Sequence, residues 1–232
     1  MSEPIKIDVW SDIACPWCYI GKRKFEAGAS TFAQAGEGRD VVVEYHSYEL
    51  APDTPVDFDG SEIDFLVKHK GMPSGQVQQM LDRVGGIAAD AGLRYDFDIL
   101  QHTNTVKAHE LLHFAKREGK QLEMTERLLK AYFTEGKHVG RIGDLADLAA
   151  EVGLDRDAVV ASLESNEFLA DVREDQSLAQ SYGIQGVPFF VIDGAYGVSG
   201  AQEATTFAQV LEQVWTDRSA AGDETVADEV TA

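Results

Sequence analysis

Cysteine is scarce in this chain of 232 residues, which holds only Cys15 and Cys18. Two cysteines are too few for a disulfide-stapled secreted scaffold, and too few for a zinc module built on paired CxxC motifs. They lie three positions apart, a spacing that two randomly placed cysteines would reach roughly 1% of the time. The spacing is therefore uncommon enough to suggest a shared chemical role.

Positive charge is also in short supply, because 20 lysines and arginines stand against 40 aspartates and glutamates, a formal net charge of −20. Such a chain repels polyphosphates, and its longest basic cluster, residues 22–24, is too short to bind nucleic acid or a membrane surface. We therefore expect neither among its partners. The acidity itself is typical of a solvated, soluble surface.

Long apolar runs are absent as well, which excludes a transmembrane helix. Residues 1–8 lack the basic region and the long apolar region of a secretory signal. The composition, 44% hydrophobic and 26% charged, is ordinary for a globular protein. We therefore expect a folded cytoplasmic protein.

Strand and helix patterns alternate at the two ends of the chain. β-branched and apolar residues predict strands at 4–10 and 41–46, and the helix between them, 16–35, has Pro16 in its first turn. This strand–helix–strand unit suits a parallel crossover. Near the other end, strands at 187–192 and 196–198 flank Asp193-Gly194, a hairpin signal, and a last helix runs from Gln202 to about Trp215.

Between these ends, residues 61–182 predict a helical block, because apolar residues recur there at spacings of three and four. Several glycines occupy positions typical of helix ends. The segments with this periodicity are 77–91, 106–118, 123–134, 142–152 and 155–163. Residues 217–232 are acidic and have no apolar face, so we expect a disordered tail there.

The cysteine pair falls at the start of the first predicted helix. Residues three apart on a helix share a face, and the helix N-terminus favours a thiolate through its free N–H groups and its dipole. Cys15 has the better position and is expected to be the exposed nucleophile, and Cys18, a turn inside, the more buried resolving thiol. The alternatives are a pair of buried small hydrophobes or, since no other cysteine is available, a weak metal site.

A proline near the last strands forms the second candidate element. Pro188 opens a segment that otherwise reads as a buried strand, where a missing N–H is tolerated only at the start. A cis Val187–Pro188 bond would turn the chain sharply and expose the polar groups of Val187 to an incoming peptide. An ordinary trans proline at a strand entrance is the alternative.

These motifs resemble the DsbA-like thioredoxin-fold family, in particular its FrnE-like cytoplasmic branch. The resemblance covers nearly the whole chain and is carried by residues 11–21, which include Cys15-Pro16-Trp17-Cys18, and by residues 104–113, 186–190 and 199–202. It implies an α/β protein, a thioredoxin fold with a large all-helical insertion, a redox-active cysteine pair and a cis-proline facing that pair. We accordingly assign residues 1–58 and 183–216 to a thioredoxin-like domain and residues 59–182 to a helical insertion domain.

The resemblance also extends to kappa-class glutathione transferases and 2-hydroxychromene-2-carboxylate isomerases. Those relatives normally carry serine at the position of Cys15, and they tend to carry an acid near the segment 200–202, which is Gly-Ala-Gln here. A glutathione-dependent transferase or isomerase is therefore the alternative function, and a non-enzymatic module that binds unfolded chains is a third class.

Other residues have both a chemical and a structural interpretation. His109, Glu110 and His113 match the H-E-x-x-H zinc protease pattern, but no third ligand follows at the expected spacing, so we predict packing or pocket lining and no metal. Asp8 and Asp12 are candidate proton acceptors for the resolving thiol, or else a strand residue and a turn or cap residue.

Three more positions carry structural expectations. Residues 22–24, Lys-Arg-Lys, are expected to form a solvated helix face, although Lys22 would add positive potential near the thiols. Asn104 and Thr105 are expected to cap a helix. Trp17 cannot be fully buried if the site is exposed.

The sequence thus predicts a thiol–disulfide oxidoreductase of the reductase or isomerase type, which acts on protein or small-molecule disulfides through the Cys15–Cys18 pair. Cys15, Cys18 and Pro188 are the expected catalytic residues, and Pro16, Trp17 and Val187 are expected to contact the substrate. No cofactor is expected. The expected partners are proteins or peptides that contain disulfides or thiols, and an unknown protein that recycles the cysteine pair.

Overall fold

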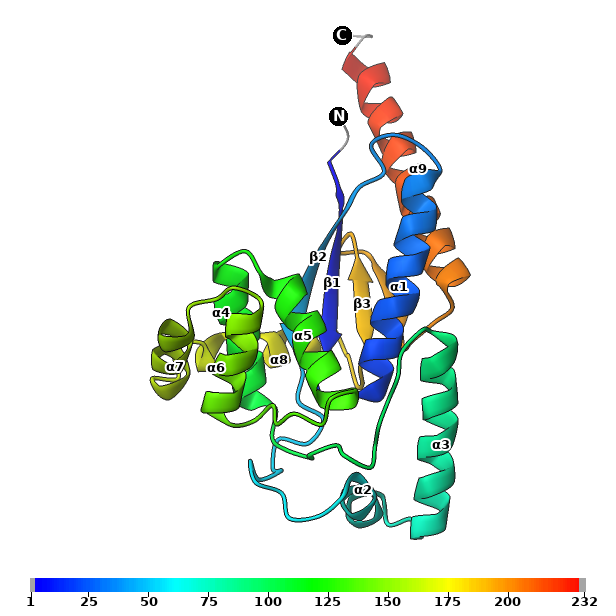
Figure 1. Ribbon diagram of the computed structural model, residues 1–232. Helices are drawn as coiled ribbons and strands as arrows, with labels where there is room; N and C mark the ends of the chain where they lie inside the picture. Colours follow the sequence, from blue (N-terminus) through cyan, green and yellow to red (C-terminus); the bar gives the residue numbers. More distant parts are fainter. Residues whose placement is uncertain (1–2, 230–232) are drawn as a thin grey trace.

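The computed structural model describes residues 3–229 and contains a mixed four-stranded sheet (Figure 1). The strands lie in the order β2-β1-β3-β4, with β1 parallel to β2 and antiparallel to β3, and β3 antiparallel to β4. Their bounds are β1 Ile5–Ser11, β2 Val41–Ser47, β3 Phe189–Ile192 and β4 Tyr196–Ser199. The expected strand–helix–strand unit and the hairpin at Asp193-Gly194 are both present.

Helices account for most of the remaining described residues. Their bounds are α1 Pro16–Gln34, α2 Glu62–Lys70, α3 Ser74–Asp90, α4 Val106–Arg117, α5 Gln121–Phe133, α6 Ile142–Glu151, α7 Arg156–Glu164, α8 Leu169–Ser181 and α9 Ala204–Glu229. Helices α2 to α8 occupy the expected helical block, and α2 and α8 are the two that the apolar spacing did not single out. No described helix is long and apolar enough to cross a membrane.

The two faces of the sheet pack against different helices. Ile5, Ile7 and Val9 alternate along β1 and pack with Phe25 of α1 and Phe207 of α9 in one core. Gly28 allows α1 and α9 to approach closely, because a Cβ there would lie 2.6 Å from the backbone oxygen of Ala204. Helices α5 and α8 contact β2, and the helical block extends to the other side of the sheet from α1 (Figure 1).

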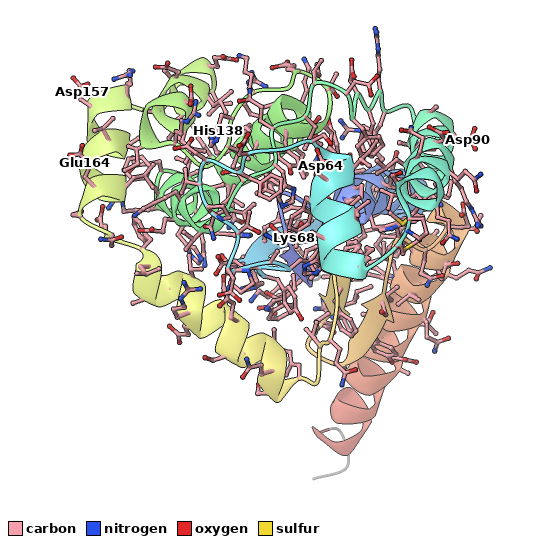
Figure 2. The ribbon with its side chains drawn as sticks, turned by 90° about the horizontal axis from the view of Figure 1, so that it is seen from below. Asp64, Lys68, Asp90, His138, Asp157 and Glu164 are labelled. Atoms are coloured by element: carbon pink, nitrogen blue, oxygen red, sulfur yellow. The ribbon has the colours of Figure 1, made fainter. Side chains whose placement is uncertain are left out.

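The helical block shares its main core with the thioredoxin-like part of the chain. Ile13, Tyr19 and Ile20, from the start of α1 and the loop before it, belong to the same buried cluster as Leu111 of α4 and Leu128 of α5. Helices α2 and α3 form a smaller cluster of their own. α2 crosses the lower end of the molecule, beside the start of α1, as Figure 2 shows with Asp64 and Lys68 of α2 labelled.

An ion-pair cluster ties α1 to α5. Glu126 of α5 accepts from Tyr19, at 2.6 Å, and pairs with Arg23 and with Lys22, whose Nζ lies 2.8 Å from Glu126 and 2.5 Å from Glu26. Lys22 is only 6% exposed. The expectation of a solvated face is therefore wrong for Lys22, because α5 of the insertion covers it.

The last helix is longer than expected. α9 does not end near Trp215 but continues to Glu229, through the described part of the segment for which the sequence predicts a disordered tail. Arg218 pairs with Asp193 and donates to the backbone oxygen of Glu3, at 2.8 Å, and Gln213 donates to Asp217, at 2.9 Å. The contacts of Arg218 tie α9 to the turn between β3 and β4 and to the segment before β1. Residues 230–232 lie outside the described chain.

The start of β1 and the end of α9 lie at the same end of the molecule, the upper one in Figure 1. The start of α1 lies at the lower end of the sheet, where β1 leads into it, with α2 and the lower part of α3 below it.

Candidate active site at the start of α1

Cys15 is the N-cap residue of α1, and Pro16 follows as the first residue of the helix. The backbone of Cys15 is extended, with φ −93° and ψ 112°, and its carbonyl accepts the N–H of Cys18 at 3.0 Å. Proline is favoured at this position because the N–H that it lacks would have no partner in the helix. Both cysteines carry free thiols, so the structure represents the reduced pair.

The expected contrast in exposure between the two thiols is absent. Cys15 is 3% exposed and Cys18 2%, so the expectation of an exposed Cys15 is wrong. The start of α1 is not an open edge, because α2, α3 and the loop after β2 cover it and enclose a cavity of about 320 Å³. Cys15, Pro16 and Trp17 line this space, which we call the Cys15 cavity. Cys18 is not among the lining residues.

The environment of Cys18 distinguishes it from Cys15. Burial raises the pKa of the Cys18 thiol well above its usual range, and the neighbouring Cys15 sulfur raises it further. The backbone N–H of Asp12 donates to Cys18 Sγ at 3.5 Å and acts in the opposite direction. Cys18 is therefore held as a thiol while Cys15 is reduced, which fits a resolving role better than an attacking one.

Val187 and Pro188 lie beside Cys15, although they are more than 170 positions away in the sequence. The Val187–Pro188 peptide bond is cis, and Cys15 Sγ donates to the backbone oxygen of Val187 at 3.6 Å. Pro188 packs on α1 where Gly21 leaves room, since a Cβ at that position would lie 2.8 Å from Pro188 Cγ. The structure thus brings together Cys15, Cys18 and Pro188.

Trp17 extends outward from the same turn and is 40% exposed. It lines the Cys15 cavity on one side and, on the other, a more open groove of about 640 Å³ between α1, α3 and the start of α9. Arg23 and Lys24 line that groove, but both are paired with glutamates. Trp17 therefore separates a more enclosed space beside the thiol from a more open groove with a mixed polar and apolar lining.

Asp12 anchors the loop that carries Cys15. Its buried carboxylate accepts N–H groups from Ala14, at 3.3 Å, and Leu50, at 2.8 Å, and it lies 3.4 Å from His109 Nε2. Burial raises its pKa, but these hydrogen bonds outweigh burial and leave the pKa below its ordinary value of 3.8. A carboxylate so stabilised is a poor proton acceptor, which favours the turn interpretation of Asp12 over the catalytic one.

The two histidines of the H-E-x-x-H pattern have different partners. His109 faces Asp12, whereas His113 Nε2 lies 3.0 Å from Asp175 of α8. Glu110 is engaged by Lys107 at 2.8 Å. The pattern thus links α4 to two separate carboxylates, and these contacts account for the residues as packing groups.

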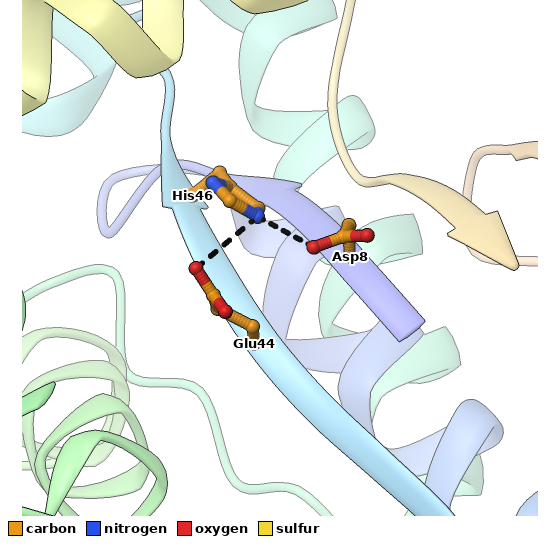
Figure 3. Close-up of side chains that lie close together, drawn as sticks. All are labelled: Asp8, Glu44 and His46. Atoms are coloured by element: carbon orange, nitrogen blue, oxygen red, sulfur yellow. Dashed lines mark hydrogen bonds and ion pairs between the residues drawn. The ribbon is translucent and has the colours of Figure 1, made fainter. Parts of the chain in front are cut away.

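Asp8, the other candidate proton acceptor, belongs to a cluster on the sheet that is shown in Figure 3. His46 lies between two carboxylates, with Nε2 2.8 Å from Asp8 and Nδ1 2.7 Å from Asp175, and Glu44 lies 3.7 Å from Nε2. Burial lowers the pKa of His46, but the hydrogen bond to Asp175 and the other carboxylates outweigh burial and raise it above 6.5. His46 is therefore favoured in its charged form.

The ligand atoms of Asp8, Glu44 and His46 lie within 4.8 Å of one another, close enough to hold a metal ion. Each acid, however, already has a cation: Lys6 lies 3.0 Å from Asp8, and Lys116 lies 2.5 Å from Glu44. These lysines and the imidazolium compensate the charge that a metal would neutralise. We therefore describe the cluster as a salt-bridge network.

Several residues at the site could not be found from sequence patterns. Tyr95 donates to the backbone oxygen of Pro16 at 2.7 Å, and Glu62 and His102 form a buried pair in the wall of the Cys15 cavity. Glu62 is the first residue of α2, and Tyr95 and His102 lie in the segment between α3 and α4, which has no clear periodicity or motif. Their placement depends on how the insertion folds back over α1, which no local signal records.

Comparison with known proteins agrees with this geometry. The family model of the DSBA-like thioredoxin domain matches residues 6–212. The crystal structure of the probable DsbA oxidoreductase SCO1869 from Streptomyces coelicolor is 38% identical, with a TM-score of 0.84 over 91% of this chain and 90% of that one. YwbO of Bacillus subtilis (strain 168), an uncharacterized protein, is 32% identical over 211 residues, which are 89% of this chain and 96% of YwbO.

A more distant structure shares the fold. The cytosolic disulfide reductase DsbM from Pseudomonas aeruginosa, solved with GSH, is 18% identical and has a TM-score of 0.63 over 91% of this chain and 99% of that one. The family match agrees with the sheet order, the helical insertion and the cysteine pair, and the chain therefore belongs to the DSBA-like thioredoxin domain family of oxidoreductases.

Proposed function

We propose that the protein is a thiol–disulfide oxidoreductase of the reductase or isomerase type, and that Cys15 is its nucleophile. The observation that carries the proposal is the asymmetry of the pair. Cys15 lines the cavity and lies 3.6 Å from the Val187 oxygen, whereas Cys18 lies behind it with a strongly raised pKa. Only one of the two thiols is therefore placed to meet a substrate.

The reaction begins when the Cys15 thiolate attacks one sulfur of a substrate disulfide. A bond forms between Cys15 Sγ and that sulfur, and the other substrate sulfur leaves as a thiolate that takes up a proton. The Cys15 sulfur then carries no charge, which removes its contribution to the raised pKa of Cys18. Cys18 consequently becomes easier to deprotonate at the stage at which it has to react.

In the second step, the Cys18 thiolate attacks Cys15 Sγ. The Cys15–Cys18 disulfide forms and the second substrate thiolate leaves, so that two electrons pass from the cysteine pair to the substrate. A dithiol protein or two small thiols must then reduce the pair. Run in reverse, the same steps oxidise a dithiol. A cytoplasmic address, which stays a prediction, favours reduction or isomerisation.

Insulin reduction in the presence of dithiothreitol tests the proposal. We expect the parent protein to accelerate precipitation of the insulin B chain, and Cys15→Ser to fall to the uncatalysed rate. Cys18→Ser should accumulate a mixed disulfide at Cys15 that mass spectrometry detects. An active Cys15→Ser variant, or faster alkylation of Cys18 than of Cys15 at neutral pH, would contradict the assignment. If the protein binds unfolded insulin without reducing it, the binding module is the better description.

A further inference from the structure

The Cys15 cavity is predominantly apolar and largely enclosed. Besides the residues around Cys15, its walls come from α2, α3 and the loop after β2. The apolar lining residues from these elements are Leu50, Phe65, Leu66, Met80, Leu81 and Val84. A volume of about 320 Å³ lies at the lower end of the range that small organic ligands occupy in proteins. The space beside the thiol is therefore suited to a compact apolar group.

One polar group in this wall lacks a partner. His102 is 5% exposed, and its Nδ1 lies 2.8 Å from Glu62 and 3.3 Å from the hydroxyl of Tyr132. Its Nε2 is buried and makes no hydrogen bond within the described part of the chain. Buried polar atoms normally have a partner, because an unpaired one loses its hydration without compensation. A residue that lines a ligand-sized cavity and keeps an unpaired nitrogen is a candidate ligand contact.

The geometry points to a low-molecular-weight disulfide as the substrate of Cys15. The substrate carries a compact apolar group, aromatic or branched, within a few bonds of its sulfur, and a hydroxyl that binds His102 Nε2 after a small movement of the wall opens this buried nitrogen to the cavity. This inference rests on the proposed function and names its substrate class. A hydroxyl fits because it donates to a neutral Nε2 and accepts from a protonated one.

The charges around the cavity argue against a charged peptide as the occupant. Asp12 and Glu62 are buried carboxylates that line the cavity, and Lys70, which is exposed, lines it as well. Glutathione carries two carboxylates and one ammonium group, and burying these beside Asp12 and Glu62 costs desolvation and repulsion. A neutral apolar group meets neither cost and gains from leaving water.

The test uses disulfides that share one thiol and differ only in an acyl group. The symmetrical disulfides of N-acetyl-, N-phenylacetyl-, N-(4-hydroxyphenylacetyl)- and N-succinylcysteamine have similar leaving groups, because the sulfur belongs to cysteamine in each. Oxidised glutathione is the peptide arm. The Cys18→Ser protein traps the mixed disulfide at Cys15, and mass spectrometry of quenched samples follows its formation. The rate constant for each disulfide is divided by the rate constant for its reaction with a free small thiol, which corrects for its intrinsic reactivity.

We expect the phenylacetyl compound to react about tenfold faster than the acetyl compound, since burial of an aromatic group favours the encounter. The 4-hydroxyphenylacetyl compound should be faster still, and the succinyl compound and oxidised glutathione slower. Equal rates for the acetyl and phenylacetyl compounds, or a preference for oxidised glutathione, would overturn the inference and leave the proposed function intact. Failure of Cys15 to react with any disulfide would overturn the proposed function itself.

Two variants of α3 provide a matched pair. Val84→Trp fills the Cys15 cavity, whereas Ile87→Trp, one turn further along, places the same side chain at the groove beyond Trp17. The aromatic preference should disappear in Val84→Trp and persist in Ile87→Trp, and loss in both or in neither would contradict the assignment. His102→Phe should remove only the preference for the hydroxyl compound. If Val84→Trp or His102→Phe fails to fold, the rates of the disulfide series with Cys18→Ser, whose cavity residues are unaltered, decide the question.

Discussion

At the scale of single residues, Asp12 shows how the site is held together. Its carboxylate joins the residue before Cys15, the cavity wall at Leu50 and the His109 side chain of α4. Its backbone N–H, and not its carboxylate, contacts Cys18 Sγ. Asp12 therefore acts on both cysteines by fixing the loop between β1 and α1.

Asp12→Asn separates this role from proton transfer. The variant keeps the volume and the backbone N–H but loses the charge opposite His109, so we expect unfolding in urea to become easier by about 2–4 kcal/mol. The pH dependence of Cys15–Cys18 disulfide closure, measured after formation of a mixed disulfide, should keep its midpoint. A shift of that midpoint by a full pH unit would identify Asp12 as the proton acceptor.

At the scale of the elements, α1 is the helix that both halves of the molecule share. One side packs on the sheet and α9, and the other on α5 and the insertion core. The polar part of this second contact is the cluster of Tyr19, Lys22 and Arg23 around Glu126. Burial raises the pKa of Glu126, but the hydrogen bond from Arg23 and its other partners outweigh burial and lower it from 4.5 to about 2.

Glu126→Gln should weaken the contact between α1 and α5. Because Lys22 is buried and loses a charged partner, we expect a loss of about 2–3 kcal/mol at pH 7. The folded pKa of Glu126 lies below the unfolded one, so its contribution is present above pH 4.5 and disappears as the pH falls toward about 2. Urea titrations of the parent and the variant at pH 7 and pH 3 measure the loss of stability and its decrease at low pH.

The exposed pair Asp147–Arg156 supplies the control for this variant. Asp147→Asn should change the free energy of unfolding by no more than about 0.5 kcal/mol. An equal effect of the two substitutions would mean that Glu126 contributes only as a surface charge.

At the scale of the whole molecule, the network around His46 connects β1, β2 and α8, and through Asp175 it reaches His113 of α4. The pKa of His46 is raised above 6.5. Burial raises the pKa of Asp175, but the hydrogen bonds from His113 and His46 outweigh burial and lower the Asp175 pKa below 3.8. The imidazolium therefore contributes stability that is complete below pH 6.5 and is lost as the pH rises through the folded pKa.

His46→Gln should accordingly destabilise the protein more in mildly acidic than in alkaline solution. We expect a difference from the parent of about 2–4 kcal/mol near pH 6 that becomes smaller toward pH 9. His69→Gln, at an exposed histidine, is the control and should change the free energy of unfolding by no more than about 0.5 kcal/mol. A His46→Gln effect that grows with pH would mean that His46 is neutral in the folded protein.

The sequence predicted the features that depend on local pattern, and it missed those that depend on packing between distant segments. The strands, α1, the hairpin and the cysteine pair have short-range signals, and the family resemblance supplied the position of Pro188 beside Cys15. The burial of Cys15 and Lys22 was missed because α2, α3 and α5 cover them from elsewhere in the chain. The length of α9 was missed because the residues after Trp215 have no apolar face, so the periodicity that predicts a helix is missing there.

The separation between the chain ends and the thiol has a practical consequence. The start of β1 and the end of α9 lie at the upper end of the molecule in Figure 1, whereas the start of α1 lies at the lower end of the sheet. A linker attached at either terminus would therefore leave from the end of the sheet that is farther from Cys15. The protein can thus be immobilised on a resin or an electrode, or fused behind a carrier, without the support lying against the Cys15 cavity.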